Sequence, residues 1–278
     1  MKLTAKEFIE WPNKAITLLG MSGAGKTTLA YKLPSSKWFH YSGDYRIGTK
    51  YLAEPILDNI KRQAMLIGFL KELLLSDSIY IASNITVNNL APVASFLGKI
   101  GREDLGGLSV EEFQKRQRLH REAEIGAMRD VVQFIEKAKR IYGYQHFIND
   151  AGGSICELND EETTNILAEQ TLILYLKPDE AMELTLIKRA ADTPKPMYYQ
   201  KEFLVQQLSQ YIASTGLTDP DEIVPDEFSR WVFPRLLEHR RPAYEAYADA
   251  HGYTIDARKA ARATSEYAFL KLVASVMD

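Results

Sequence analysis

Several features that would decide a protein's class are scarce in this chain. Its 278 residues include one cysteine, Cys156, so no disulfide can form within the chain and a cysteine-based metal cluster is disfavoured. No apolar run approaches the ~18 residues of a membrane-spanning helix, and the first residues lack an apolar secretory segment. The 34 Lys and Arg are outnumbered by 37 Asp and Glu, whereas general nucleic-acid binders are basic. We therefore expect a soluble cytoplasmic protein whose partner is neither a membrane nor, in the main, a nucleic acid.

One segment, residues 20–28, is far more specific than the rest. It reads G-x-x-x-x-G-K-T, with Gly20, Gly25, Lys26 and Thr27 in the fixed places. An apolar run precedes it and a helix-forming run follows it, which is the strand–loop–helix context of a phosphate-binding loop. Glycines let successive backbone N–H groups turn toward one anion, and the next helix points its positive end at that anion.

In such a loop the lysine reaches the outer phosphates and the following hydroxyl ligates Mg²⁺. The sequence therefore predicts a site for ATP and Mg²⁺, without distinguishing ATP from GTP. The predicted contacts to the nucleotide are Gly20, Ser22, Gly23, Ala24, Gly25, Lys26, Thr27 and Thr28.

Short apolar runs bounded by turns are typical of buried parallel strands. Between them lie helical patterns, so we predict an α/β fold: the three-layer αβα architecture of phosphate-loop NTPases, with a mainly parallel five-stranded sheet. The predicted strands are 15–19, 37–41, 145–148, 171–176 and 252–255.

About a hundred residues separate the second and third predicted strands, which far exceeds an ordinary crossover. We assign 1–44 and 145–278 to the core and 45–144 to a helical insertion, which is either a cap over the substrate or a structural scaffold. Within the insertion the patterns predict an amphipathic helix over 55–75, loops with at most a short helix over 83–107, and a long helix over 113–141 that starts from a capping box at Ser109.

Polar residues follow the second and third predicted strands, where ligands of such sheets bind. Asp44 is placed to accept a proton from a substrate hydroxyl or to hold Mg²⁺, and Arg46 to pair with an anionic substrate. Asp150 stands where an acidic residue orients Mg²⁺, and Gly152 and Gly153 let the backbone approach a ligand. A helix cap and a simple turn are the structural alternatives for these two segments.

Two later segments carry cations. Arg189 precedes a loop with prolines on both sides of Lys195, which suits a mobile lid closing over phosphates. Lys195 would neutralise the transferring charge and Arg189 could stack on adenine, although a solvated loop has the same composition. Arg241 precedes Pro242, which we predict to be the first residue of a further helix.

Taken in order, these segments resemble the shikimate kinase and gluconate kinase-like group of phosphate-loop kinases, outside the insertion. The resemblance implies that Asp44 holds the acceptor hydroxyl, Gly152 and Gly153 line the acceptor pocket, and Arg241 holds a substrate carboxylate. It also places Arg189 on adenine and Lys195 on phosphate, where the family has arginine. Ser42 stands at the family's Mg²⁺-linked aspartate, so the metal role would pass to Asp150. The segments that carry the resemblance are 20–27, 43–47, 151–154, 189–197, 241–244 and 248–249.

We therefore expect an ATP-dependent phosphotransferase acting on a hydroxyl of a small, anionic metabolite, with Lys26, Asp44 and Lys195 as catalytic residues. Two alternatives stay open. The basic run from Lys115 to Arg121 would suit a nucleotide or RNA-type acceptor. The size of the insertion would suit a nucleotide-gated ATPase that recognises a protein partner.

Overall fold

The computed structural model describes residues 1–277. Its centre is one five-stranded sheet in the order β2-β3-β1-β4-β5, and every strand pair is parallel. Each predicted strand is confirmed close to its predicted bounds. The strands are β1 (Ala15–Leu19), β2 (Trp38–Ser42), β3 (His146–Asp150), β4 (Leu172–Lys177) and β5 (Gly252–Asp256).

The strands are buried on both faces, so alternate side chains enter two separate cores. In β1, Ile16 and Leu18 enter one core while Leu19 enters the other. The first core is closed by helices α1 (Ala5–Glu10), α2 (Lys26–Lys32), α12 (Ala257–Arg262) and α13 (Glu266–Ala274).

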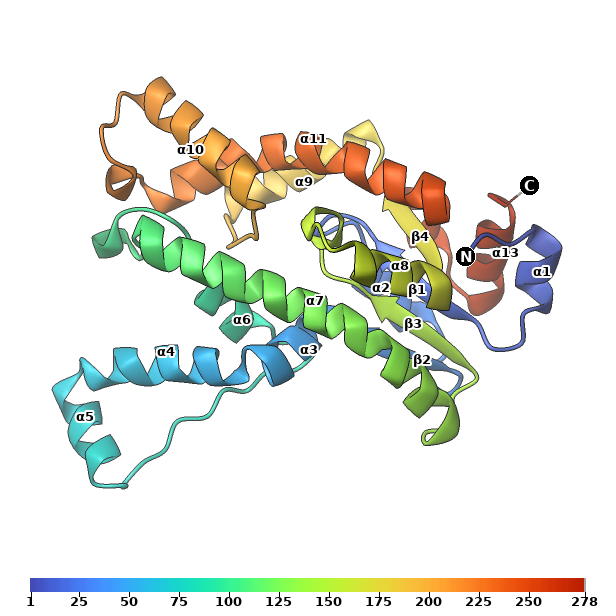
Figure 1. The fold of residues 1–278 in the computed structure, drawn as a ribbon, viewed down its shortest axis with the longest axis horizontal. Helices are drawn as coiled ribbons and strands as arrows, with labels where there is room; N and C mark the ends of the chain where they lie inside the picture. Colours follow the sequence, from blue (N-terminus) through green and yellow to red (C-terminus); the bar gives the residue numbers. More distant parts are fainter. Residues whose placement is uncertain (278) are drawn as a thin grey trace.

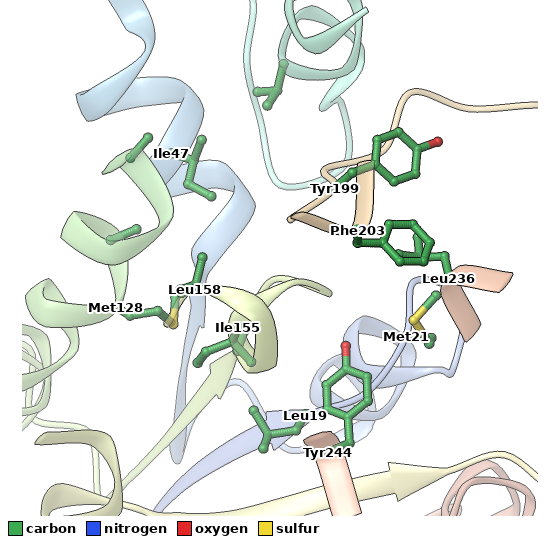
Figure 2. Packing of buried hydrophobic residues seen from close by; sticks show 14 of the residues in the cluster. Leu19, Met21, Ile47, Met128, Ile155, Leu158, Tyr199, Phe203, Leu236 and Tyr244 are labelled. Atoms are coloured by element: carbon green, nitrogen blue, oxygen red, sulfur yellow. The ribbon is translucent and has the colours of Figure 1, made fainter. Parts of the chain in front are cut away.

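The second core is closed by α7 (Val110–Arg140), α8 (Glu161–Gln170), α9 (Glu180–Asp192) and α11 (Pro225–His251). Figure 2 shows how side chains from several of these elements meet near the ends of the strands: Leu19 from β1, Met128 from α7, Ile155 from the short helix η3 (Ile155–Glu157) and Tyr244 from α11. The fold is thus a three-layer αβα sandwich, as predicted.

All the chain between β2 and β3 is helix and loop. Its elements are α3 (Gly43–Arg46), the π-helix η1 (Ile47–Tyr51), α4 (Ala53–Met65), α5 (Gly68–Leu75), α6 (Ala91–Leu97), the 3₁₀-helix η2 (Glu103–Leu105) and α7. Figure 1 shows α4 and α5 projecting away from the sheet as an arm, while α7 runs back along the sheet.

The single helix predicted over 55–75 is wrong, because the chain breaks between α4 and α5. Ile67 is extended at the break (φ −98°, ψ 110°), and Gly68, which is a poor helix residue, follows it. The two short helices then pack against each other. The long helix is confirmed: Ser109 caps α7 by accepting the N–H of Glu112.

The helix start predicted at Pro242 is also wrong. Pro234 and Pro242 both lie inside α11, which is continuous from Pro225 to His251. A proline removes one backbone hydrogen bond from a helix interior, but α11 keeps its course because its apolar side packs on β4, β5 and α9. No helix within residues 1–277 is long and apolar enough to cross a membrane.

Candidate active site

The loop between β1 and α2 has the backbone that its glycines were expected to allow. Gly20, Gly23 and Gly25 all have positive φ, at 142°, 85° and 95°. Side chains are strained in this region, and a Cβ on Gly23 would also lie 2.8 Å from Leu186 Cδ2. The loop connects the central strand of the sheet to the start of α2. This is the geometry of a phosphate-binding loop.

Lys26, the first residue of α2, is buried within this loop. Its Nζ donates to the carbonyl oxygens of Gly20 (2.6 Å) and Met21 (3.2 Å). Burial lowers the pKa of its ammonium group, and the charges of Asp150 and Asp44 oppose that shift. The ammonium group of Lys26 is therefore influenced by the charges of two carboxylates, Asp44 and Asp150, which follow different strands of the sheet.

Thr27 and Asp150 lie together, as the prediction of a shared metal site requires. The Thr27 hydroxyl donates to Asp150 Oδ2, and His40 Nε2 lies 3.7 Å from the same oxygen. A hydroxyl and one carboxylate fit Mg²⁺ that is otherwise held by phosphate oxygens and water. Among the described residues no group of three or more His, Cys, Asp or Glu could hold a metal by itself.

Asp44 and Gly152 lie at the same end of the sheet as the phosphate loop, and they are joined there by Glu124 of α7. A Cβ added to Gly152 would overlap Glu124 Oε1 and would lie 3.5 Å from Asp44 Oδ1. The two carboxyl groups therefore both lie beside Gly152, where only a glycine leaves room for Glu124 Oε1. Burial raises the pKa of Asp44, to which the charge of Asp150 also contributes.

Glu124 is fully buried and has no cation bonded to it. Its Oε2 accepts a hydrogen bond from the Ser154 hydroxyl, and Oε1 has no hydrogen-bond partner in residues 1–277. Burial raises the pKa of this carboxyl to about 7, although the bond from Ser154 opposes the shift. An unpaired carboxyl inside a protein takes up a proton rather than remain charged.

This raised pKa makes stability depend on pH in a definite direction. The unfolded chain ionises Glu124 near its ordinary pKa of 4.5 and the folded protein only near 7, so wild-type stability falls between these two pH values. We expect Glu124→Gln, which has no such group, to gain about 3 kcal/mol relative to wild type between pH 4.5 and pH 8. Urea unfolding at several pH values measures the difference. Glu122→Gln, an exposed change on the same helix, should show no pH trend, and a flat difference for Glu124→Gln would contradict the shift.

Arg189 and Lys195 lie on the other side of the loop. With Ser22 and Gly23 they line a cavity of about 180 Å³ that is closed by Leu186, Met197 and Phe233. Neither cationic side chain has a hydrogen bond or ion pair among the described residues, so both are free to meet a ligand. The far end of this segment is tied to α7, because Gln117 accepts from Tyr199 N (2.8 Å) and donates to Met197 O (3.2 Å).

The two other predicted substrate contacts are bound to protein carboxylates. Arg46 donates to Asp130 Oδ2 (2.8 Å) on α7, and Arg241 donates to Glu183 Oε2 (2.7 Å) on α9. The basic run of α7 is also used inside the fold. Arg116 is buried and bonded to Glu112 and to Phe96 O, and Arg121 donates to Leu158 O.

An arginine that contacts the phosphate loop is Arg240, to which the sequence analysis assigns no site role; its Nη1 lies 3.8 Å from Met21 Sδ. It is 1% exposed, and its guanidinium bonds to Glu157 Oε2 (2.7 Å), Gly153 O (2.8 Å) and Tyr198 O (2.9 Å). It thereby links α11 to the glycine motif after β3 and to the segment after α9. Arg241, the next residue along the helix, points toward α9 instead.

Comparison with known proteins finds a likeness to solved structures only. No protein-family model matches the chain, and no curated protein matches it. Among solved structures, the chain is similar to the crystal structure of shikimate kinase from Bacteroides thetaiotaomicron, at 15% identity and a TM-score of 0.32. The match covers 81% of this chain and 98% of that one. Because identity and TM-score are both low, the function of this chain has to follow from its own site.

The sequence assigned no site role to Glu124 or Arg240, although the sequence pattern around each residue indicates that it is buried. Each stands in the apolar stripe of an amphipathic helix, at the helical spacing of buried neighbours. A charged residue in such a stripe must find a partner inside the fold.

Arg240 and Glu157 form a buried ion pair, and we expect its loss to be costly. Removing one partner of such a pair costs about 3–5 kcal/mol, because the other charge is left buried and unpaired. Arg240→Met should lose about that much stability in urea unfolding. Arg241→Met is the matched control, since the pair it breaks is far more accessible to water, with side chains 39% and 20% exposed, and such pairs contribute about 0–1 kcal/mol. Equal losses for both variants would contradict the burial argument, and adding Glu157→Gln to Arg240→Met should recover part of the loss.

Proposed function

We propose that this protein is an ATP-dependent phosphotransferase that moves the γ-phosphate to a hydroxyl of a small metabolite. One observation carries the proposal: Gly43 and Asp44 pack against Asp150 and Gly152, so the carboxyl group of Asp44 stands at the strand end that also holds the Thr27–Asp150 pair. A second carboxyl group, beside the one that pairs with Thr27, is placed where it can accept the proton of an acceptor hydroxyl.

The roles follow from this arrangement. Lys26 and Lys195 would neutralise charge on the phosphates. Thr27 and Asp150 would hold Mg²⁺, which screens the phosphate charges when it is bound. Asp44 would take the proton of the acceptor hydroxyl while the oxygen–phosphorus bond forms and the bond from the γ-phosphorus to ADP breaks. Arg189, beside Ser22 and Gly23, is the candidate contact to the base.

The anionic character predicted for the acceptor relied on Arg46 and Arg241. Each would have to leave a carboxylate of this protein, Asp130 or Glu183, to bind one on the substrate. That prediction therefore has no support from the geometry, whereas the hydroxyl-binding role of Asp44 has support from its place beside Gly152.

ADP release from Mg·ATP tests the proposal, measured first with the protein alone and then with pools of small metabolites. Lys26→Ala serves as the blank. Release that rises with one pool is the expected result, and subdividing that pool identifies the acceptor. A slow release that no pool changes would overturn the assignment as a metabolite kinase.

A second candidate is favoured by one observation on the arm formed by α4, α5 and the loop that follows. Large apolar side chains are exposed there, among them Leu66, Phe69 and Tyr80 at 77%, 71% and 89%. Exposed apolar groups gathered on one projection are typical of a protein contact. Under this candidate the protein is a nucleotide-gated ATPase that binds a partner through the arm, and Asp44 and Lys195 are dispensable.

A further inference from the structure

The carboxyl of Glu124 is the one acidic group of the site that the proposed chemistry does not use. The residue is 0% exposed and lies in the stretch of α7 that faces the strand ends. Its Oε2 is held by Ser154, while its Oε1 lies against Gly152, beside which Asp44 Oδ1 also lies, and has no partner among residues 1–277. A buried oxygen without a partner costs free energy that a bound donor group would recover.

No charged group within residues 1–277 supplies that partner. On α7 itself, His120 Nδ1 lies 3.8 Å from Oε2, and its own burial lowers the pKa of the imidazole to about 4, so it is neutral. From α11, Arg240 directs its guanidinium to Glu157, Gly153 O and Tyr198 O. From α2, Lys26 Nζ donates to two carbonyl groups of the phosphate loop. From α3, Asp44 places a second carboxyl group, not a cation, beside Gly152.

We infer that Glu124 is an acceptor-binding residue: Oε1 takes a hydrogen bond from a donor group of the acceptor that neighbours the hydroxyl held by Asp44. This inference rests on the proposed phosphotransferase function and gives the acceptor a chemical class. Its reacting end carries a second hydrogen-bond donor, either a hydroxyl or an ammonium group, beside the hydroxyl that is phosphorylated. A carboxylate at that position is rejected, because it would meet the carboxyl groups of Asp44 and Glu124, and the buried cation near them, Lys26, already donates to two carbonyl groups of the loop.

A matched series of two-carbon alcohols tests this class. Ethylene glycol, ethanolamine, ethanol and glycolate share one hydroxyl and differ in the neighbouring group, which is a hydroxyl, an ammonium, a hydrogen or a carboxylate. With wild-type protein and Mg·ATP, we expect ethylene glycol or ethanolamine to raise ADP release above ethanol, with a phosphate ester seen by ³¹P NMR, and glycolate to have the least effect. A greatest effect with glycolate, or the same rate with all four, would overturn the inference.

Variants of Glu124 separate the two donors. Glu124→Ala should raise the KM of the effective alcohol about ten- to a hundredfold, the range for a hydrogen bond to a charged group. Glu124→Gln keeps an oxygen acceptor but not the charge, so it should preserve most binding of a diol and lose binding of ethanolamine. Glu122→Gln, exposed on the same helix, is the matched control. Unchanged KM values in both Glu124 variants would overturn the inference.

The experiments distinguish a failure of the proposed phosphotransferase function from a failure of the role inferred for Glu124. If Mg·ATP does not bind the wild-type protein, or if Lys26→Ala releases ADP at the wild-type rate, the phosphotransferase assignment falls. If nucleotide binds and a metabolite pool stimulates release, but that acceptor has no donor beside its reacting hydroxyl, only the role of Glu124 falls. Nucleotide binding by Glu124→Gln shows that the variant is folded.

Discussion

Replacing Lys26 with alanine is expected to lower ADP release from Mg·ATP about a thousandfold or more. The ammonium group is buried in the loop, where a charge acts on phosphate with little screening by water. The other cation that touches the loop is Arg240, whose Nη1 lies 3.8 Å from Met21 Sδ. Its guanidinium is held by Glu157, Gly153 O and Tyr198 O, so it is not free to replace the lysine. Single-turnover measurement with saturating ATP separates this loss from weaker binding.

Two controls make that result specific. Lys32→Ala removes a partly exposed lysine, which lies at the far end of the same helix and donates to Ala261 O, and should leave the rate unchanged. Lys26→Met keeps the length and apolar stem of the side chain, so it tests the charge rather than the packing. A Lys26→Met variant with wild-type turnover would show that the loop is not the reacting centre.

Asp44→Asn is expected to lower phosphotransfer about 10²- to 10⁴-fold, the usual contribution of a positioned base. Asparagine has nearly the same shape but cannot accept the proton of the attacking hydroxyl. Nucleotide affinity should change little, because Asp44 lies beside Gly152 rather than in the phosphate loop. Turnover with the acceptor and equilibrium binding of a non-hydrolysable ATP analogue are the two measurements.

Because Glu124 is a second carboxyl group beside Asp44, the same measurement on Glu124→Gln shows which of the two is the base. Asp58→Asn, an exposed change on α4, is the control and should have no effect. If Asp44→Asn kept wild-type turnover while Glu124→Gln lost it, the base would be Glu124 and the assignment of Asp44 would be wrong. If both variants kept acceptor-dependent turnover, neither carboxyl group would be the base, and the assignment of Asp44 would be wrong.

Much of the fold could be predicted because the signals for it are local. The strands and the phosphate loop are short segments whose apolar pattern and glycines determine their structure without help from distant residues. The start of α7 was readable for the same reason, since Ser109 and Glu112 are three residues apart. The errors came where packing decides: the break before Gly68, and α11, which continues through Pro242 because it lies against the sheet.

The candidate site shows the same division. Lys26, Thr27, Asp44 and Asp150 follow directly from strand order, because the ends of parallel strands meet at one edge of the sheet. Glu124 reaches that edge from a helix whose rotation about its axis is set by packing. The only sign of its burial in the sequence is its position in the apolar stripe of that helix. The rotation of α11 about its axis likewise decides which of two adjacent arginines is buried. Arg240 faces the interior and binds Glu157, whereas Arg241 binds Glu183.

The pairing of β2 with β3 also has a consequence for how the chain folds. These two strands lie side by side in register, yet about a hundred residues separate them in the sequence, and closing such a loop is entropically costly. Helix α7, whose backbone bonds are local, packs on both strands and can form before either is paired. A fold with so many distant contacts is acquired slowly. The segment that carries Glu124 is therefore also the surface on which this edge of the sheet assembles.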